Sequence, residues 1–171
     1  PYAAREYAND LTAETVKLLM EKPFFNELEF RLVGKGPLFH EILDPLQGIP
    51  NVIIEENFLN HDEIAALHKE YGIFLTPTRM DSQGVSRDEA MSSGLVPVTT
   101  AVTAIPEFCD ETCAILAPGE DAKAMAEGIE RLYNDPELFM QMSANAAARV
   151  RRQVSRAQTI GRELTLINGS K

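Results

Sequence analysis

The sequence of 171 residues is poor in cationic residues and cysteines, and it has no long apolar run. Sixteen lysines and arginines stand against 26 aspartates and glutamates, and the net charge of −10 argues against non-specific nucleic-acid binding, which requires clustered cations. Because no run of about 18 apolar residues occurs, nothing is expected to span a membrane, and no signal peptide is visible. With 44% apolar and 25% charged residues, the composition predicts one globular domain with its own core.

The few cysteines and histidines do not form a metal-binding pattern. Cys109 and Cys113 lie four residues apart and match neither a CxxC pair nor a zinc site, so two reduced thiols in a cytoplasmic protein are expected. His40, His61 and His68 lack acidic or cysteine partners at ligand spacing. We therefore predict surface or helix-cap histidines and no metal site.

Short apolar runs that alternate with helical segments indicate a parallel α/β fold. Strands are predicted at residues 28–33, 51–55, 72–76, 95–99 and 113–116. Helices are predicted at about residues 9–21, 61–70, 86–93, 121–133 and 137–152. The pattern predicts an open, doubly wound, Rossmann-like parallel sheet of about five or six strands flanked by helices. Residues 1–153 are expected to form this single domain, followed by a weakly helical tail at 154–171.

The stretch from Tyr71 to Thr100 reads as strand, polar loop, helix and strand, with Gly84 in the loop. In open parallel sheets, ligands bind at the carboxyl ends of strands, which is where this loop would lie. Asp81 and Glu89 flank Gly84 at a helix N-terminus, where unpaired N–H groups suit an anion. Carboxylates accept hydrogen bonds from sugar hydroxyls. The residues therefore predict a site for a phosphorylated sugar or a nucleotide.

Two of these features also have simpler explanations, which the sequence leaves open. Ser86 followed by Glu89 is a capping box, in which Glu89 would only satisfy the start of the helix. The turn formed by Gly34 and Gly36 is neither a P-loop nor a complete GxGxxG, and a plain strand-to-helix turn is favoured there over a phosphate-facing loop.

Several motifs in a fixed order resemble one family. They are the run from Gly72 to Thr100, FRLVGKGP and NVIIEENFLNHDEIAALH before it, and AIPE and GIERLYNDPELF after it. Over most of residues 30–152 the chain resembles the C-terminal, donor-binding domain of a family 4 (group 1) glycosyltransferase with the GT-B fold. The resemblance implies half of a retaining, metal-independent, hexosyltransferase-like enzyme of glycan biosynthesis. A first strand and an N-terminal acceptor-binding domain would precede Pro1, so the isolated chain is expected not to catalyse transfer.

The resemblance also assigns roles at the central loop. Glu89 matches the family's glutamate that binds the ribose hydroxyls of the nucleotide. Asp81, with a shorter side chain, takes the place of the glutamate that contacts the donor sugar. Gly84 matches the family's glycine, and the backbone from Gln83 through Val85 to Ser86 would face the diphosphate and the sugar.

Elsewhere the match is partial. Gly34 and Gly36 match a glycine turn near the donor cleft. The family's Arg and Lys that neutralise the diphosphate are not evident, because ANDL stands where a Lys-Gly pair precedes the first helix, and Arg5 is the partial substitute. The segment that begins at Thr103 lacks the double glycine common before the Pro-Glu pair.

The implied substrate is a nucleotide-diphosphate sugar of the UDP or GDP type, bound without a cofactor or a metal. The implied location is the cytoplasm, with peripheral membrane attachment through the upstream domain as the alternative. Two other functions fit the residues: a non-catalytic α/β module that acts through protein contacts, which the missing lysine motif favours, and a sugar-nucleotide epimerase on the same fold.

Overall fold

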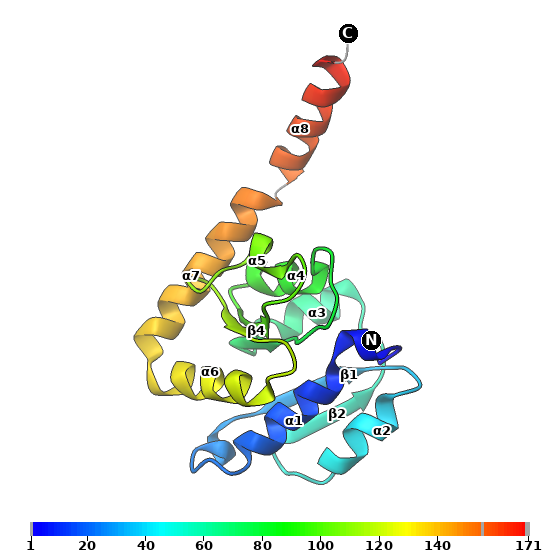
Figure 1. Ribbon diagram of the computed structural model, residues 1–171, viewed down its shortest axis with the longest axis vertical. Helices are drawn as coiled ribbons and strands as arrows, with labels where there is room; N and C mark the ends of the chain where they lie inside the picture. The colour runs from blue at the N-terminus through cyan, green and yellow to red at the C-terminus, as the bar shows by residue number, and fades with distance from the viewer. Residues whose placement is uncertain (1, 155, 170–171) are drawn as a thin grey trace.

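The computed structural model describes residues 2–154 and 156–169 (Figure 1). In chain order the strands are β1 (Phe30–Gly34), β2 (Val52–Glu56), β3 (Ile73–Leu75), β4 (Val96–Thr100) and β5 (Ile115–Ala117). The α-helices are α1 (Asn9–Leu19), α2 (Phe39–Leu43), α3 (His61–Leu67), α4 (Val85–Ser92), α5 (Ile105–Phe108), α6 (Ala122–Asn134), α7 (Pro136–Gln153) and α8 (Arg156–Gly169). Short 3₁₀ turns lie at Arg5–Tyr7, Phe25–Glu27 and Asp44–Leu46. Every strand and helix predicted above from the sequence has its counterpart in the structure.

The strands pair in parallel, which confirms the α/β class with Rossmann-like parallel sheets flanked by helices. β1 pairs with β2, from Phe30 opposite Val52 to Gly34 opposite Glu56. β3, β4 and β5 pair in that order. The expectation of one sheet of five or six strands is wrong, because the described strands form one sheet of two and one of three. Paired strands of a sheet lie about 4.8 Å apart. β1 and β3 do not pair, and a cavity of about 620 Å³ lies between them.

The core surrounds β4, all of which is buried. The helices α4, α6 and α7 contact this strand, and Val96 and Val98 are wholly inaccessible to solvent. Full burial of such a side chain stabilises the fold by about 1.5–3 kcal/mol. These helices hold the three-stranded sheet, and with it the loops at its carboxyl edge.

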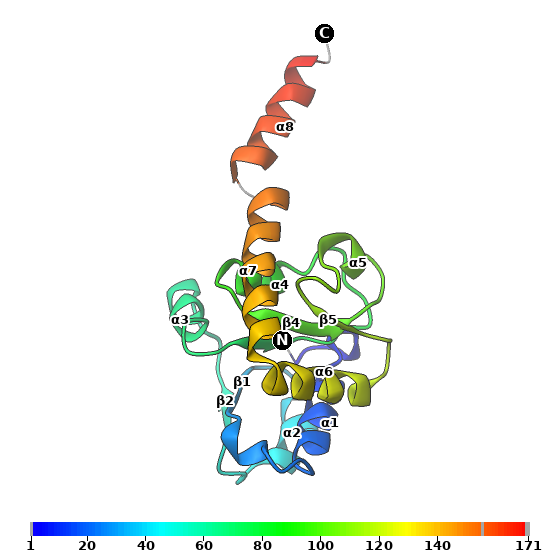
Figure 2. The same cartoon turned by 90° about the vertical axis from the view of Figure 1, so that its left-hand side faces the viewer.

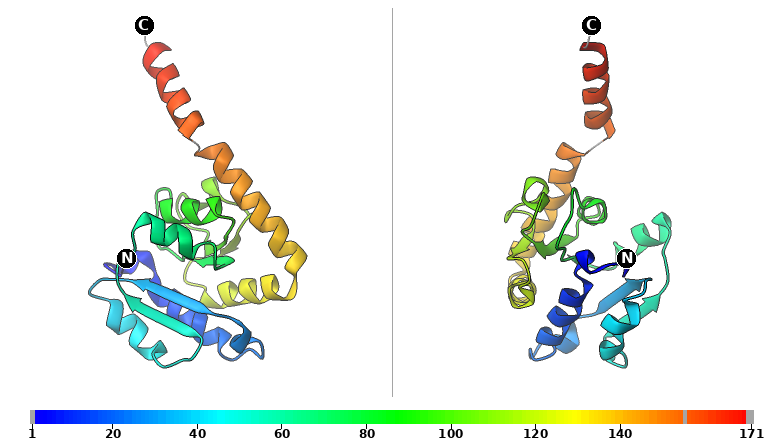
Figure 3. Two further views of the ribbon diagram at one scale, coloured as in Figure 1. Left: turned by 180° about the vertical axis from the view of Figure 1, so that it is seen from behind. Right: turned by 45° about the vertical axis from the view of Figure 1, so that its right-hand side comes forward.

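Helix packing joins the two sheets into one body. One face of α1 is buried, with Val16 and Leu19 at 0% exposure, and α1 packs along α6. In the view from behind, α1 lies with the two-stranded sheet, while α6 leads into α7 beside the three-stranded sheet (Figure 3). The contact between α1 and α6 therefore helps to tie the two halves together.

The C-terminal segment is a helix that projects from this body. α7 runs along the domain, and α8 continues away from it toward the C-terminus (Figures 1 and 2). The predicted tail also includes residues 155, 170 and 171, which lie outside the described residues. Within the described ranges, we find no helix with the length and apolar character needed to cross a bilayer.

Candidate functional site

The loop after β3 is fastened to the segment after β4 by hydroxyl groups. Thr100 Oγ1 accepts a hydrogen bond from Thr78 N at 3.0 Å. Thr103 Oγ1 accepts from Asp81 N at 3.1 Å and donates to Asp81 O at 2.7 Å. Thr103, which stands where the double glycine is lacking, has a positive φ of 48°. These bonds hold the loop at the carboxyl edge of the three-stranded sheet, where ligands of such sheets bind.

Helix α4 begins directly after Gly84, its N-cap residue, which has a φ of 80° that favours glycine. Among the described residues, no side chain caps this helix end. Ser86 is the second residue inside the helix, so the capping box proposed as an alternative for Ser86 and Glu89 is not formed. The first N–H groups of a helix have no intrahelical partner. The N-terminus of α4 therefore offers backbone donors together with the positive end of the helix dipole.

Asp81 contacts the backbone of its own loop. Its Oδ1 accepts a hydrogen bond from Gln83 N at 3.0 Å, the pattern of an aspartate turn. This bond holds the loop immediately before α4. The contact with a donor sugar stays a prediction, and one of the two carboxylate oxygens already has this local partner.

Glu89 lies on the side of α4 that faces α3. Its side chain is 42% exposed, and its Oε1 is 3.9 Å from Nδ1 of His61, the first residue of α3. Burial lowers the pKa of His68 just beyond α3, and the charge of Glu89 opposes that shift. Glu89 is thus accessible to a ligand, five residues beyond the N-cap of α4.

Sequence reasoning missed Arg87, which is buried in α4 with 1% exposure. Its Nη2 donates to Gln83 O and, at 2.8 Å, to Oδ1 of Asp88, while the guanidinium lies 5.3 Å from the centre of the Phe108 ring. A signal was present, because Arg87 and Asp88 are adjacent opposite charges in a short helix with a buried face. Asp88 is buried as well, at 7% exposure, so the two charges face inward as a pair.

Arg79 is a second cation at this edge that sequence reasoning missed. Its guanidinium donates to both carboxylate oxygens of Asp10 at 2.8 Å and to both of Glu120 at 2.7 and 2.8 Å. The bond from Arg79 lowers the pKa of Asp10, and the two carboxylates raise the pKa of Arg79. Its backbone N–H donates to Glu6 O at 2.8 Å, which brings the N-terminal segment beside the loop after β3.

Arg5 belongs to that N-terminal segment. Its side chain is exposed and pairs with Glu41 of α2 at 2.8 Å, while its carbonyl accepts from Arg79 Nη1. Ala8, at the start of α1, has the left-handed φ of 48°. The structure therefore brings the backbone of Arg5 to the Arg79 loop, and its guanidinium to α2.

Gly34 and Gly36 make room for the start of the chain. A Cβ at Gly36 would lie 2.3 Å from Tyr2 O, and one at Gly34 would lie 2.6 Å from the Tyr2 ring. Close packing against Tyr2 thus accounts for both glycines, in line with the plain-turn explanation. A role beside the donor stays a prediction.

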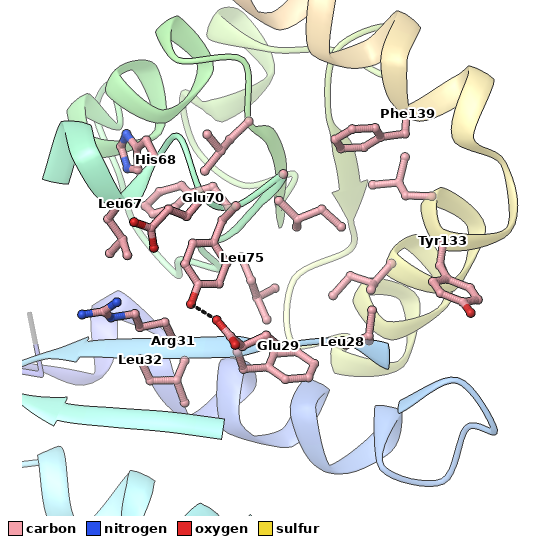
Figure 4. Close-up of a pocket in the computed structure, with 18 of the residues that line it drawn as sticks. Leu28, Glu29, Arg31, Leu32, Leu67, His68, Glu70, Leu75, Tyr133 and Phe139 are labelled. Carbon is pink, nitrogen blue, oxygen red and sulfur yellow. Dashed lines mark hydrogen bonds between the residues drawn. The ribbon is translucent and has the colours of Figure 1, made fainter. Parts of the chain in front are cut away.

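The cavity of about 620 Å³ lies away from the predicted site residues, none of which line it. Figure 4 shows Glu29 and Arg31 of the β1 edge on one side, and Leu75 of β3 on the other. The hydroxyl of Tyr71 donates to Glu29 across this space, and burial first, then Glu29, raises the pKa of Tyr71 to about 12. The cavity is therefore an opening between two strand edges, distinct from the loop at Gly84.

The remaining polar candidates have local partners. His40 contacts Asp44 at 3.1 Å and Glu56 at 3.3 Å, so the expectation that it lacks acidic partners is wrong. Within the described residues, no group of three or more possible metal ligands occurs. Cys109 and Cys113 are buried free thiols.

A parallel α/β domain that presents an uncapped helix N-terminus and an accessible carboxylate at its carboxyl edge belongs to the class of domains suited to phosphate-bearing ligands. The profile of the family described as "Glycosyl transferases group 1" matches residues 2–135. The chain therefore belongs to this glycosyltransferase family, and the resemblance to a GT-B C-terminal domain is confirmed.

Known proteins agree with this assignment. The chain is 26% identical over 124 residues to alpha-D-kanosaminyltransferase of Streptomyces kanamyceticus, covering 71% of this chain and 32% of that protein. It is similar in fold to S. aureus TarM, with a TM-score of 0.82, 20% identity and coverage of 98% of this chain and 34% of that one. The C-terminal domain of LpcC from Francisella tularensis gives a TM-score of 0.77, 17% identity and coverage of 90% and 82%. The chain thus spans about a third of the length of the first two proteins.

Proposed function

We propose that this chain is the nucleotide-sugar-binding half of a retaining, metal-independent, hexosyltransferase-like glycosyltransferase. The observation that carries the proposal is the uncapped N-terminus of α4 behind Gly84, at the carboxyl edge of a sheet in a member of this family. S. aureus TarM has been solved in complex with UDP, and pneumococcal GtfA with UDP and GlcNAc, which supports a donor of the UDP type, with GDP as the other candidate. Free buried thiols support a cytoplasmic location, with peripheral membrane attachment through an upstream domain as the alternative.

In this proposal the predicted residues bind the donor through two kinds of group, side-chain carboxylates and backbone N–H groups. Glu89 accepts hydrogen bonds from the ribose hydroxyls, and Asp81 contacts the donor sugar. The backbone from Gln83 to Ser86 faces the diphosphate and the sugar. The N–H groups of Gly84, Val85 and Ser86 bind the diphosphate and stabilise the negative charge that develops on it as the sugar departs, while Gln83 N holds Asp81. Arg5 supplies a cation to the donor once its guanidinium releases Glu41.

Calorimetric titration tests the donor site directly. We expect one of the UDP, GDP or ADP sugars to bind the isolated chain, with the nucleotide diphosphate supplying most of the affinity. No binding of any of them at millimolar concentration would refute the donor site and leave the fold assignment intact.

Catalysis would require an upstream domain of the whole protein, as the coverage of about a third of the relatives suggests. Tyr2 N donates to Lys35 O at 3.0 Å, beside the carboxyl end of β1. A parallel strand leading into Tyr2 would therefore run through the cavity between β1 and β3, the place of a central strand in a doubly wound sheet. We propose that such a strand of the same protein fills this cavity.

Hydrogen exchange distinguishes an added strand from a permanent opening. In a longer version of the protein, the amides of Ile73 and Leu75 should exchange more slowly than in this chain, because their edge would be paired. Sugar transfer is expected of the longer version and not of this chain. Equal exchange rates at β3 would count against the strand.

A non-catalytic interaction module is the second candidate. The observation in its favour is that Arg79 already pairs with Asp10 and Glu120, and Arg5 with Glu41, so these cations are engaged by carboxylates. Donor hydrolysis or sugar transfer by the longer protein would exclude a purely structural role.

A further inference from the structure

The buried side chain of Arg87 lies beneath the loop that precedes α4. Its Nη2 donates to the carbonyl of Gln83 and to Asp88, and its Nε contacts the same Asp88 oxygen at 3.3 Å. Its Nη1 is buried without a hydrogen-bond partner among the described residues. A guanidinium with 1% exposure cannot reach solvent, so its effect on the surface passes through the groups it holds.

The bond to Gln83 fixes the direction of the next N–H group. In a trans peptide the C=O and the N–H point to opposite sides of the chain. Because Arg87 draws the Gln83 carbonyl inward, the N–H of Gly84, in the same peptide unit, is turned away from Arg87. That N–H stands at the N-terminus of α4, next to the helix donors described above.

Glycine at position 84 and arginine at position 87 form one structural unit. A Cβ at Gly84 would lie 2.8 Å from Nη1 and 2.9 Å from Cζ of Arg87, and the φ of 80° already disfavours a side chain. Any larger residue at position 84 would push the guanidinium off the Gln83 carbonyl. The absence of a side chain at Gly84 therefore lets Arg87 hold the Gln83 carbonyl, and it also allows the positive φ of the turn.

We infer that Arg87 is a positioning residue for the donor diphosphate: by holding the Gln83 carbonyl, it aims the N–H of Gly84 at the phosphate farther from the nucleoside. The inference rests on the proposed function, since it assumes a nucleotide diphosphate at this loop. Lysine cannot replace arginine in this task, because one ammonium does not reproduce the planar fork that serves Gln83 and Asp88 together.

The test compares nucleoside diphosphate with monophosphate, because a general loss of stability would weaken both alike. The probes are the nucleotide among UDP, GDP and ADP that binds the wild-type chain, and its monophosphate. In Arg87→Lys we expect the preference for the diphosphate to fall by about tenfold, the scale of a lost hydrogen bond to a charged group. Affinity for the monophosphate should change much less.

Arg149→Lys is the matched control. Arg149 also donates to a backbone carbonyl, Phe108 O at 2.6 Å, and also pairs with an aspartate, Asp110, but it lies on α7. This variant should lower stability without changing the ratio of the two nucleotide affinities. If Arg87→Lys does not fold, Asp88→Asn removes the carboxylate that orients Arg87 and should reduce the same ratio.

The outcomes separate the two proposals. A wild-type chain that binds none of the nucleotides refutes the donor site, and the role of Arg87 falls with it. A wild-type chain that prefers the diphosphate, with folded variants at positions 87 and 88 that keep the full preference, overturns the role of Arg87 alone.

Discussion

Glu89→Ala separates the two explanations that the sequence offers for Glu89, because a glutamine could still complete a capping box. If this residue completed a capping box, its loss would lower the free energy of unfolding by about 1 kcal/mol. The helix begins at Val85 without a side-chain cap, and the Glu89 side chain is 42% exposed, so we expect a change within about 0.5 kcal/mol. If the carboxylate binds the ribose hydroxyls, the same change removes charged hydrogen bonds of about 1.5–3 kcal/mol, which weakens nucleotide binding roughly 10- to 150-fold.

Urea denaturation measures the first quantity and calorimetric titration with the bound nucleotide the second. Ser86→Ala is the matched control, because it removes the other half of the supposed capping box. It should leave both stability and affinity unchanged. A loss of about 1 kcal/mol in both variants, with unchanged nucleotide affinity in Glu89→Ala, would refute the donor role and restore the capping role.

Three further predictions concern stability and reactivity. Arg79→Ala should lower stability by about 1 kcal/mol at pH 7, since the pair with Asp10 is partly exposed. Arg79 holds the pKa of Asp10 below its ordinary 3.8, so the stability that this ion pair contributes is present above pH 3.8 and is lost as the pH falls through the lowered pKa. In an acid titration, the free energy of unfolding of the variant should therefore fall less steeply than that of the wild type. Burial raises the pKa of Cys109 to about 11, so alkylation at pH 8 should be slow in the native protein and fast in denaturant. Gly128→Val should lower the urea midpoint by the equivalent of about 1–3 kcal/mol, because its Cβ would lie 2.3 Å from Ile115.

Local patterns predicted the elements but not how the strands join. The run from Ile73 to Leu75 is apolar and β-prone, which predicts a strand. This local pattern does not indicate which other strand pairs with it. The helix at α4 was found to within a residue, because Gly84 and Gly94 bracket it. Which strands pair depends on contacts between distant segments, and those contacts leave no signature in a window of a few residues. The gap between β1 and β3 is the place that we propose for the first strand expected from the family resemblance.

The site could be predicted where one residue imposes a backbone geometry. Gly84 does so, because a left-handed N-cap favours glycine. The role of Glu89 rests on the family resemblance, since its spacing also fitted a capping box, and that role stays a prediction. Asp81 was placed correctly in the loop, yet its contact with Gln83 N depends on a turn that spacing does not reveal. Arg79 was missed because its partners Asp10 and Glu120 are distant in sequence. Arg87 has its hydrogen-bond partners Gln83 and Asp88 close by, but its burial against Phe108 depends on packing between separate elements.

If this acidic chain binds a diphosphate as we propose, the groups that attract the phosphates must lie in the binding loop itself. The net charge of −10 opposes an anion, and Arg79 pairs with Asp10 and Glu120. The dipole of α4 acts only within its first turn and contributes about 0.3–1 kcal/mol at an exposed site. Most of the affinity must then come from hydrogen bonds whose strength depends on direction. For that reason the φ of Gly84 and the hold of Arg87 on the loop should matter more to donor binding than the number of cations around it.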